Sequence, residues 1–292
     1  MATIHLHKFM SMKEHIAYAQ SVQACATGYV KQHWEGSTAI SGGRKIGRDF
    51  SGWPEVFKVA ALPWMEGMEA LAKAKKEIKD VELPIPESIR RRKTWQEEMG
   101  DGIDIHRLYQ GVPYWRGIEG RQAQGGCPIV TVLANVGTPF GYDPEQIVWR
   151  GIAAMIITDI LEDAGYRVEL WACRYGDEQY TDDSDLMTAT LLKESHGPLV
   201  EPLVVSGLAG WYYRTIVWLS YYDMTGGLEA AYGLGCPIDD FPDEAVKLVT
   251  GEDYTGKIFH IGGIFDLEDC VTLIKETIDE FNPSESSAVG VG

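Results

Sequence analysis

Residues with oxygen and amide groups follow two predicted strands, at the point where each strand ends. The strands span residues 129–134 and 167–173. The residues that follow them are Asn135, Gly137, Thr138, Asp177, Asp183 and Asp185. Because ligands of open α/β proteins bind at the carboxyl ends of strands, we expect these groups at one edge of the sheet. Oxygen ligands suit Ca²⁺ and Mg²⁺, so the pattern predicts a ligand or metal site. A solvated acidic loop is the alternative, because the spacing does not match the twelve-residue calcium loop.

Other combinations of reactive residues are weaker. The turn at residues 137–141 could present backbone N–H groups to an anion, but it lacks Gly-Lys-Ser/Thr and Gly-x-Gly-x-x-Gly, and Asp143 would compete with a phosphate. His5 and His7 share one face of a predicted strand, where they could chelate a metal or simply form a polar face. Ser195 and His196 are neighbours, which does not make a catalytic pair. We therefore predict no catalytic residue and no cofactor.

Two groups of residues could form an interaction surface. The basic run is Arg90, Arg91, Arg92 and Lys93, and Trp95 follows it. Basic residues beside an aromatic ring can bind nucleic acid or an acidic protein, and a solvated helix face is the alternative. The aromatic group is Trp211, Tyr212 and Tyr213, in a predicted helix with more aromatic residues than one core stripe can hold. Since aromatic residues are enriched at interfaces, some of them could face a partner.

The elements that position these groups alternate between strand and helix after residue 128. The helix at 143–164 begins with Asp143-Pro144-Glu145-Gln146, which combines an N-cap, a proline at the first helical position and a capping-box residue. Further strands are predicted at 186–192 and 257–261, and helices at 204–221 and 267–281. This order predicts an α/β fold with a doubly wound, mainly parallel sheet.

Charge and composition suggest two regions. Residues 1–127 contain 18 Lys and Arg against 15 Asp and Glu (+3), and residues 128–292 contain 8 against 28 (−20), which sum to −17. We predict a mildly basic, helix-rich region at 1–124, with a glycine-rich boundary near 120–128. An acidic α/β domain follows at 125–282, and then a disordered tail at 283–292. The acidic half repels phosphate backbones, so nucleic acid could bind only through the first region.

Composition also bears on the compartment. The five cysteines include no Cys-x-x-Cys pair, which is typical of reduced cytosolic thiols. The first residues lack the apolar stretch of a signal peptide, and the most apolar segment, 147–161, is interrupted by Arg150 and Asp159. We expect a cytoplasmic protein with no membrane contact.

Three segments, at residues 50–68, 100–121 and 149–172, resemble a group of uncharacterised bacteriophage and mobile-element proteins with a von Willebrand A-like core. In A-like domains the first strand ends in Asp-x-Ser-x-Ser, which holds a divalent cation. The matching residues here are Asn135-Val136-Gly137-Thr138-Pro139, without the carboxylate or the serines. The resemblance therefore implies a Rossmann-like, metal-less A-like fold of phage origin, and it brings no activity with it.

These observations lead to three hypotheses. The first is a non-enzymatic interaction or assembly protein that binds a protein partner or a second copy of itself. The second, from a different class, is a divalent-metal-dependent enzyme acting on a phosphorylated small molecule or nucleic acid at the carboxyl edge of the sheet. The third is a nucleic-acid-binding accessory protein that uses the basic run at residues 90–93.

Overall fold

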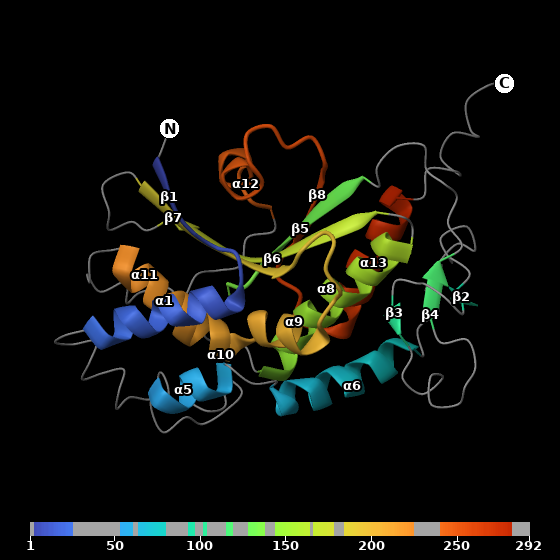
Figure 1. Cartoon of the computed structure of the whole chain (residues 1–292), viewed down its shortest axis with the longest axis horizontal. Helices are drawn as coiled ribbons and strands as arrows, with labels where there is room; N and C mark the ends of the chain where they lie inside the picture. Colours follow the sequence, from blue (N-terminus) through green and yellow to red (C-terminus); the bar gives the residue numbers. More distant parts are fainter. Residues whose placement is uncertain are drawn as a thin grey trace.

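The computed structural model describes residues 3–25, 53–60, 64–79, 93–96, 102–103, 115–118, 128–137, 144–163, 166–177, 184–224 and 240–281. Within these residues the main sheet has five strands (Figure 1). They are β1 (Thr3–Phe9), β5 (Ile129–Asn135), β6 (Arg167–Asp177), β7 (Ser184–Lys193) and β8 (Lys257–Ile261).

The sheet has the order β1-β7-β6-β5-β8. β5 pairs in parallel with β6 and β8, and β1 pairs in parallel with β7, whereas β6 and β7 are antiparallel. The predicted α/β class with a mainly parallel sheet is confirmed. The antiparallel pair was not predicted; only six residues separate β6 from β7, too few for the crossover that a parallel pair requires.

The unit formed by β5, α8 (Pro144–Asp163) and β6 agrees closely with its prediction. β5 is an apolar strand that is buried on both faces, as its β-branched sequence indicates. α8 begins at Pro144, the expected first helical position, although Asp143 lies outside the described residues. β8 and α13 (Leu267–Phe281) also have their predicted limits. The Asp269 N–H donates to Asp266 Oδ1 over 2.9 Å, so Asp266 caps α13.

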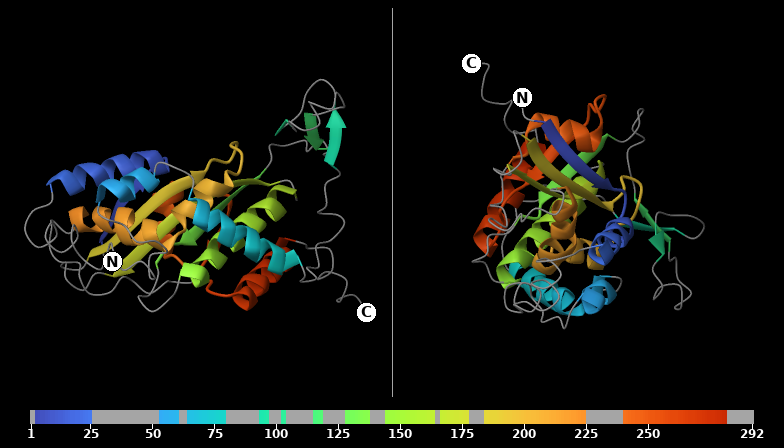
Figure 2. Two further views of the ribbon diagram at one scale, coloured as in Figure 1. Left: turned by 90° about the horizontal axis from the view of Figure 1, so that it is seen from below. Right: turned by 90° about the vertical axis from the view of Figure 1, so that its left-hand side faces the viewer.

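Most described helices cover one face of the sheet (Figures 1 and 2). They are α1 (Met12–Cys25), α5 (Trp53–Ala60), α6 (Met65–Lys79), α8, α9 (Glu201–Gly207), α10 (Gly210–Tyr212), the π-helix η1 (Tyr213–Val217), α11 (Trp218–Met224) and α13. On the other face, α12 (Asp243–Thr250) packs Ala245 and Val249 near Leu133 and Trp171. Among the described helices, α12 alone lies on that face (Figure 1). The described helices are therefore less evenly divided between the two faces than in a doubly wound sheet, which has helices on both.

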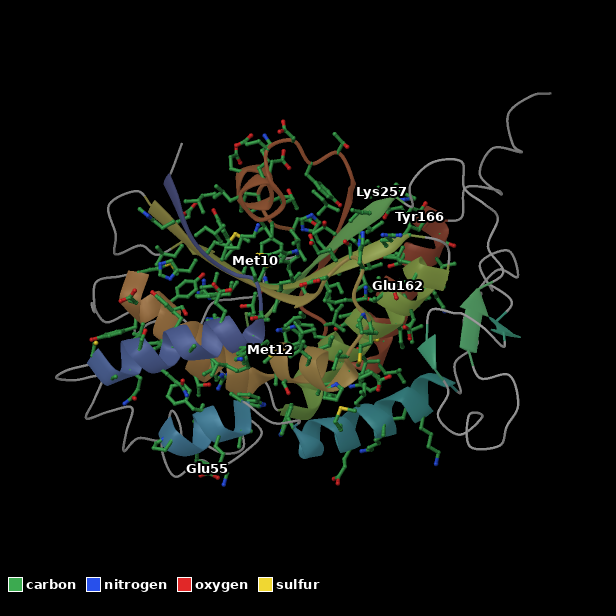
Figure 3. All side chains as sticks on the ribbon, viewed as in Figure 1. Met10, Met12, Glu55, Glu162, Tyr166 and Lys257 are labelled. Carbon is green, nitrogen blue, oxygen red and sulfur yellow. The ribbon has the colours of Figure 1, made fainter. Side chains whose placement is uncertain are left out.

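The described elements of the first half belong to the same core as the second half. β1 is a strand of the main sheet, and Met12 of α1, Val56 of α5 and Leu71 of α6 share a hydrophobic cluster with Val132 of β5. Figure 3 shows side chains filling the space between the helices and the sheet, with Met12 labelled on α1. The predicted boundary therefore does not separate two cores, because strand pairing joins residues on either side of it. The boundary itself and the tail at 283–292 lie outside the described residues.

A second, small sheet has the order β2-β4-β3 in the described part of the chain, and Figure 2 shows it beside the main body. Its strands are β2 (Lys93–Gln96), β3 (Gly102–Ile103) and β4 (Trp115–Ile118). The region before residue 124 thus contains strands as well as helices. None of the helices in the described ranges is long and apolar enough to span a membrane.

Candidate functional site

The predicted oxygen-rich edge is divided by the register of the sheet. Asn135, the last residue of β5, lies opposite Cys173, whereas Asp177 at the end of β6 lies opposite Asp185. β6 therefore extends four residues past the level of Asn135. At ~3.3 Å per residue this overhang is about 13 Å long, so these groups do not meet at one point.

The side chains of this edge are used in local contacts. Asn135 is buried, and its Oδ1 accepts the N–H of Gly137 over 2.7 Å, which stabilises the turn. Asp185 accepts a hydrogen bond from the Tyr175 hydroxyl across the hairpin. Thr138 and Asp183 lie outside the described residues. In the described ranges no three His, Cys, Asp or Glu side chains, including His5 and His7, form a group that could hold a metal ion.

The predicted aromatic surface is wrong. Trp211, Tyr212 and Tyr213 are between 0 and 2% exposed, so they cannot face a partner in this structure. Their segment lies between β7 on one side and α1 on the other, and side chains on several sides of the helix therefore enter the core. Of the predicted basic surface, Arg90, Arg91 and Arg92 lie outside the described residues, and Lys93 begins β2 opposite Ile118.

Ser195 and His196 do contact each other, but they are poorly arranged for nucleophilic catalysis. Ser195 Oγ lies 2.9 Å from His196 Nδ1, and Arg167 donates to His196 Nε2 from 2.6 Å. A neutral ring that accepts at Nε2 carries its proton on Nδ1 and donates it to the serine. Such a histidine cannot remove the serine proton, so the pair forms a surface hydrogen-bond network.

A different polar group lies at the carboxyl ends of β5 and β6, on the face covered by most helices. Its first member is Arg150, in the second turn of α8, which is fully buried. Its Nη2 donates to the carbonyl oxygen of Gly137 over 3.0 Å. The guanidinium therefore lies at the turn that leaves β5, where the sequence predicted a ligand. Phe265, after β8, covers it with its ring centroid 5.5 Å away.

The second member is Arg174, the residue of β6 that follows the level of Asn135. Its side chain is 5% exposed, and Nε donates to the Tyr213 hydroxyl over 3.2 Å. Nη1 donates to the Tyr221 hydroxyl over 3.1 Å, and the guanidinium also lies over the Tyr221 ring, 4.4 Å from its centroid. The Tyr221 hydroxyl can donate in turn to the carbonyls of Arg174 and Leu186. These contacts attach α11 and η1 to the ends of β6 and β7.

The third member is Arg214, which follows Tyr213 in the π-helix η1 and is 4% exposed. Arg174 is hydrogen-bonded to the Tyr213 hydroxyl, and Arg150 and Arg214 are close enough to Tyr213 to interact with it electrostatically. We call these four residues the arginine cluster. Single π-helical turns are rare and occur frequently at functional sites. Here the π-helix contributes both Tyr213 and Arg214.

Burial lowers the pKa of two of these arginines, whereas for Arg174 burial is outweighed by Tyr221 and Tyr213, which raise its pKa. Burial lowers the pKa of Arg150 to about 10 and also lowers the pKa of Arg214, because a buried cation loses its hydration. Arg150 nevertheless remains charged at neutral pH. The described hydrogen bonds of Arg150 and Arg174 include those to the Gly137 carbonyl and to the hydroxyls of Tyr213 and Tyr221. The cluster therefore concentrates positive charge in a low-dielectric region of a protein whose net charge is −17.

The end of β6 borders the cluster on the outside. Gly176 is half-buried, and a Cβ atom built there would lie 2.1 Å from Arg174 Nη1. The guanidinium thus lies directly against a partly exposed backbone position in the part of β6 that extends beyond β5.

Sequence reasoning did not identify the arginine cluster. One signal was present, because Arg150 interrupts the most apolar segment of the chain and a charged residue in such a segment requires a partner. Nothing in the sequence connected it with Arg174 or Arg214, which lie in different elements. Only the packing of α8, β6 and η1 places the three in one region.

The comparisons with known proteins bear on the family. A family model described as "Domain of unknown function (DUF7192)" matches residues 2–259. The comparison with curated proteins found no match, and neither did the comparison with solved structures. The match extends from β1 to β8 and covers the residues of the arginine cluster. Since it includes far more than half of the chain, this protein belongs to the DUF7192 family.

Proposed function

We propose that this protein binds the phosphate group of a small molecule at the carboxyl ends of β5 and β6. The observation that carries the proposal is the burial of three arginines near Tyr213: Arg174 donates to the Tyr213 hydroxyl, Arg150 donates to the turn after β5, and Arg214 follows Tyr213 in η1. Guanidinium groups present planar, paired donors that match phosphate oxygens. The location is the edge at which open α/β proteins bind ligands.

Charge supports an anion at this edge in preference to a cation. Arg150 donates to the Gly137 carbonyl, so a positive group already lies at the turn after β5. A divalent cation at this turn would be repelled by that guanidinium and would compete with it for the carbonyl oxygen. A phosphate would instead offset the cost of burying the arginines. The sequence hypothesis of a phosphorylated ligand is therefore retained, without its metal.

The resemblance to A-like domains is compatible with this proposal. The order of β5, its turn, α8 and β6 is the one on which the resemblance rests. At the position where that family holds a cation, this chain has Asn135 bonded to its own turn and Arg150 bonded to Gly137. We therefore include the A-like fold and the phage origin in the proposal. In this A-like core, the position that binds a cation in other members would bind an anion.

The test is thermal unfolding and calorimetry with inorganic phosphate and pyrophosphate, against sodium chloride at the same ionic strength. A ligand at about 100 times its Kd stabilises the native state by about 2.7 kcal/mol. We expect a phosphate-specific rise in Tm for the native protein. Arg174→Met should abolish this rise, because Arg174 supplies two donors to the centre of the cluster.

The matched control is Arg167→Met. Arg167 lies on the same strand but at its opposite, amino-terminal end, and it is exposed. This variant should respond to phosphate as the native protein does. If the native protein shows no response beyond ionic strength, or if both variants lose it equally, the proposed function is wrong.

A second candidate function is charge-driven assembly with a protein partner or another copy. It is favoured by the contrast between residues 1–127 at +3 and residues 128–292 at −20. Light scattering coupled to size exclusion should then show a complex at low salt that dissociates at high salt. A strict monomer at both low and high salt, with no partner recovered, would count against charge-driven assembly. The nucleic-acid hypothesis predicts salt-dependent DNA or RNA binding that is lost when residues 90–93 are neutralised.

A further inference from the structure

His15 is a residue of α1, and its side chain points toward the π-helical segment. It is fully buried, and its ring stacks on Phe9 with centroids 4.0 Å apart and planes 7° apart. Burial is the main reason that its pKa is lowered to about 3, so the ring is neutral at physiological pH. A neutral imidazole has one donor nitrogen and one acceptor nitrogen, and both have partners here.

The partners of His15 flank the π-helix on both sides. Nδ1 lies 2.9 Å from the hydroxyl of Tyr212, the residue immediately before η1. Nε2 lies 2.8 Å from Oγ of Ser220, in the first turn of α11 after η1. A third contact, 2.8 Å from Nδ1 to Oγ1 of Thr190, fixes the ring to β7. One side chain of α1 thus holds the two ends of the π-helix and attaches them to the sheet.

The register of this segment determines where the arginine cluster is built. A π-helical turn contains an extra residue relative to an α-helix. Successive residues of an α-helix are about 100° apart, so reversion to α-helix would rotate the residues on one side of the turn by roughly this angle. Tyr213 and Arg214 are the first two residues of η1. Their positions relative to Arg174 therefore depend on both ends being held.

We infer that His15 is a positioning residue for the phosphate site, acting by holding Tyr212 and Ser220 at the two ends of the π-helix. This inference rests on the proposed function, because the site that it positions is the arginine cluster. His15 itself contacts no member of that cluster among the described hydrogen bonds. Its contribution to binding is transmitted through Tyr212, which precedes Tyr213 directly.

The experiment compares two substitutions by titration calorimetry with pyrophosphate. His15→Leu fills similar space without polar atoms, and we expect it to weaken binding by about tenfold or more, equivalent to about 1.4 kcal/mol. His15→Gln keeps a donor and an acceptor and should recover part of the affinity. A purely structural role would lower Tm in both variants without this difference in affinity.

Thr277→Val is the control for general destabilisation. Thr277 is a buried residue of α13 whose Oγ1 donates to the Leu273 carbonyl over 2.7 Å, and it contacts no member of the cluster in the described contacts. It should lose stability but keep its pyrophosphate affinity. If His15→Leu does not fold, Tyr212→Phe and Ser220→Ala each remove one of the two end contacts and should each weaken binding.

The outcomes separate the two proposals. If the native protein does not bind pyrophosphate, the proposed function fails. If the native protein binds and Arg174→Met does not, but His15→Leu or both end-contact variants bind normally, the phosphate site stands and the positioning role of His15 is wrong.

Discussion

Arg174 Nε and the hydroxyl of Tyr213 are 3.2 Å apart, although 39 positions separate the two residues in the chain. The contact joins the end of β6 to the π-helix, in a region where both side chains are at most 5% exposed. Since a hydrogen bond to a charged donor is stronger than a neutral one, this pair helps to define the geometry of the cluster. Three predictions concern this geometry and the helix segment that supports it, and a fourth concerns the opposite end of the sheet.

The first prediction concerns Tyr221. Its hydroxyl contacts Arg174 Nη1 and the carbonyls of Arg174 and Leu186 at distances of 2.8 to 3.1 Å. Tyr221→Phe leaves buried polar groups with fewer partners and should lower the free energy of unfolding by about 1–3 kcal/mol. In a double-mutant cycle with Arg174→Met, measured by urea unfolding, we expect a coupling of about 0.5–3 kcal/mol. Strictly additive effects would mean that the two side chains act independently.

The second prediction uses two glycines. Gly176→Ala places a methyl group against Arg174 Nη1, so the guanidinium must move and the phosphate response should fall. Gly151→Ala is the control, because its Cβ would meet only ordinary contact at 4.0 Å from Val205 Cα. As a replacement inside α8, it should be neutral or stabilising by up to about 1 kcal/mol. Equal phosphate affinity in both variants would show that the position of Arg174 is unimportant.

The third prediction is a pH dependence. His15 has a pKa of about 3 in the folded protein, against 6.5 normally, and its titratable neighbours are His7 on β1 and Tyr212 on α10. Between these pH values the unfolded chain binds the additional proton, so stability falls as the pH falls, by up to about 1.4 kcal/mol per pH unit. His15→Gln should remove this part of the slope below about pH 6. The free energy of unfolding in urea should be measured against pH for the native protein and His15→Gln. Parallel curves for the two would contradict the prediction.

The fourth prediction concerns the buried cation at the other end of the sheet. The Lys193 side chain is 0% exposed, and its Nζ lies 2.6 Å from Glu162 Oε1, which is labelled on α8 in Figure 3. Glu162→Gln leaves the ammonium with the carbonyls of Val168 and Glu194, and should cost about 1–3 kcal/mol, because Glu162 is itself partly exposed. Lys193→Met removes the buried charge itself and should therefore be more stable than Glu162→Gln.

An exposed pair provides the comparison for this fourth experiment. Lys257 and Glu280 are 3.8 Å apart, with both side chains more than half exposed. Glu280→Gln should change the free energy of unfolding by less than about 0.5 kcal/mol, because water solvates both groups. A loss for Glu280→Gln as large as that for Glu162→Gln would mean that burial does not govern these ion pairs.

Elements with strong local signals were predictable. β5 and β8 are short apolar strands, and Asp266 and Pro144 mark the starts of α13 and α8, so their limits agree with the prediction within a residue. β2, β3, β4 and α12 were not predicted. The three strands are two to four residues long, and α12 has eight residues, so each contains too few positions for a clear period.

The sequence by itself determined the α/β class, the central β5-α8-β6 unit and the presence of a charged residue inside an apolar helix, because these follow from side-chain periodicity and local capping. Only the tertiary structure decided that α10, η1 and α11 are covered on two sides, which removed the expected aromatic surface. It also decided that Arg150, Arg174 and Arg214 are buried near Tyr213. That arrangement depends on sheet register and on a π-helical turn, both of which are set by contacts between residues distant in the chain.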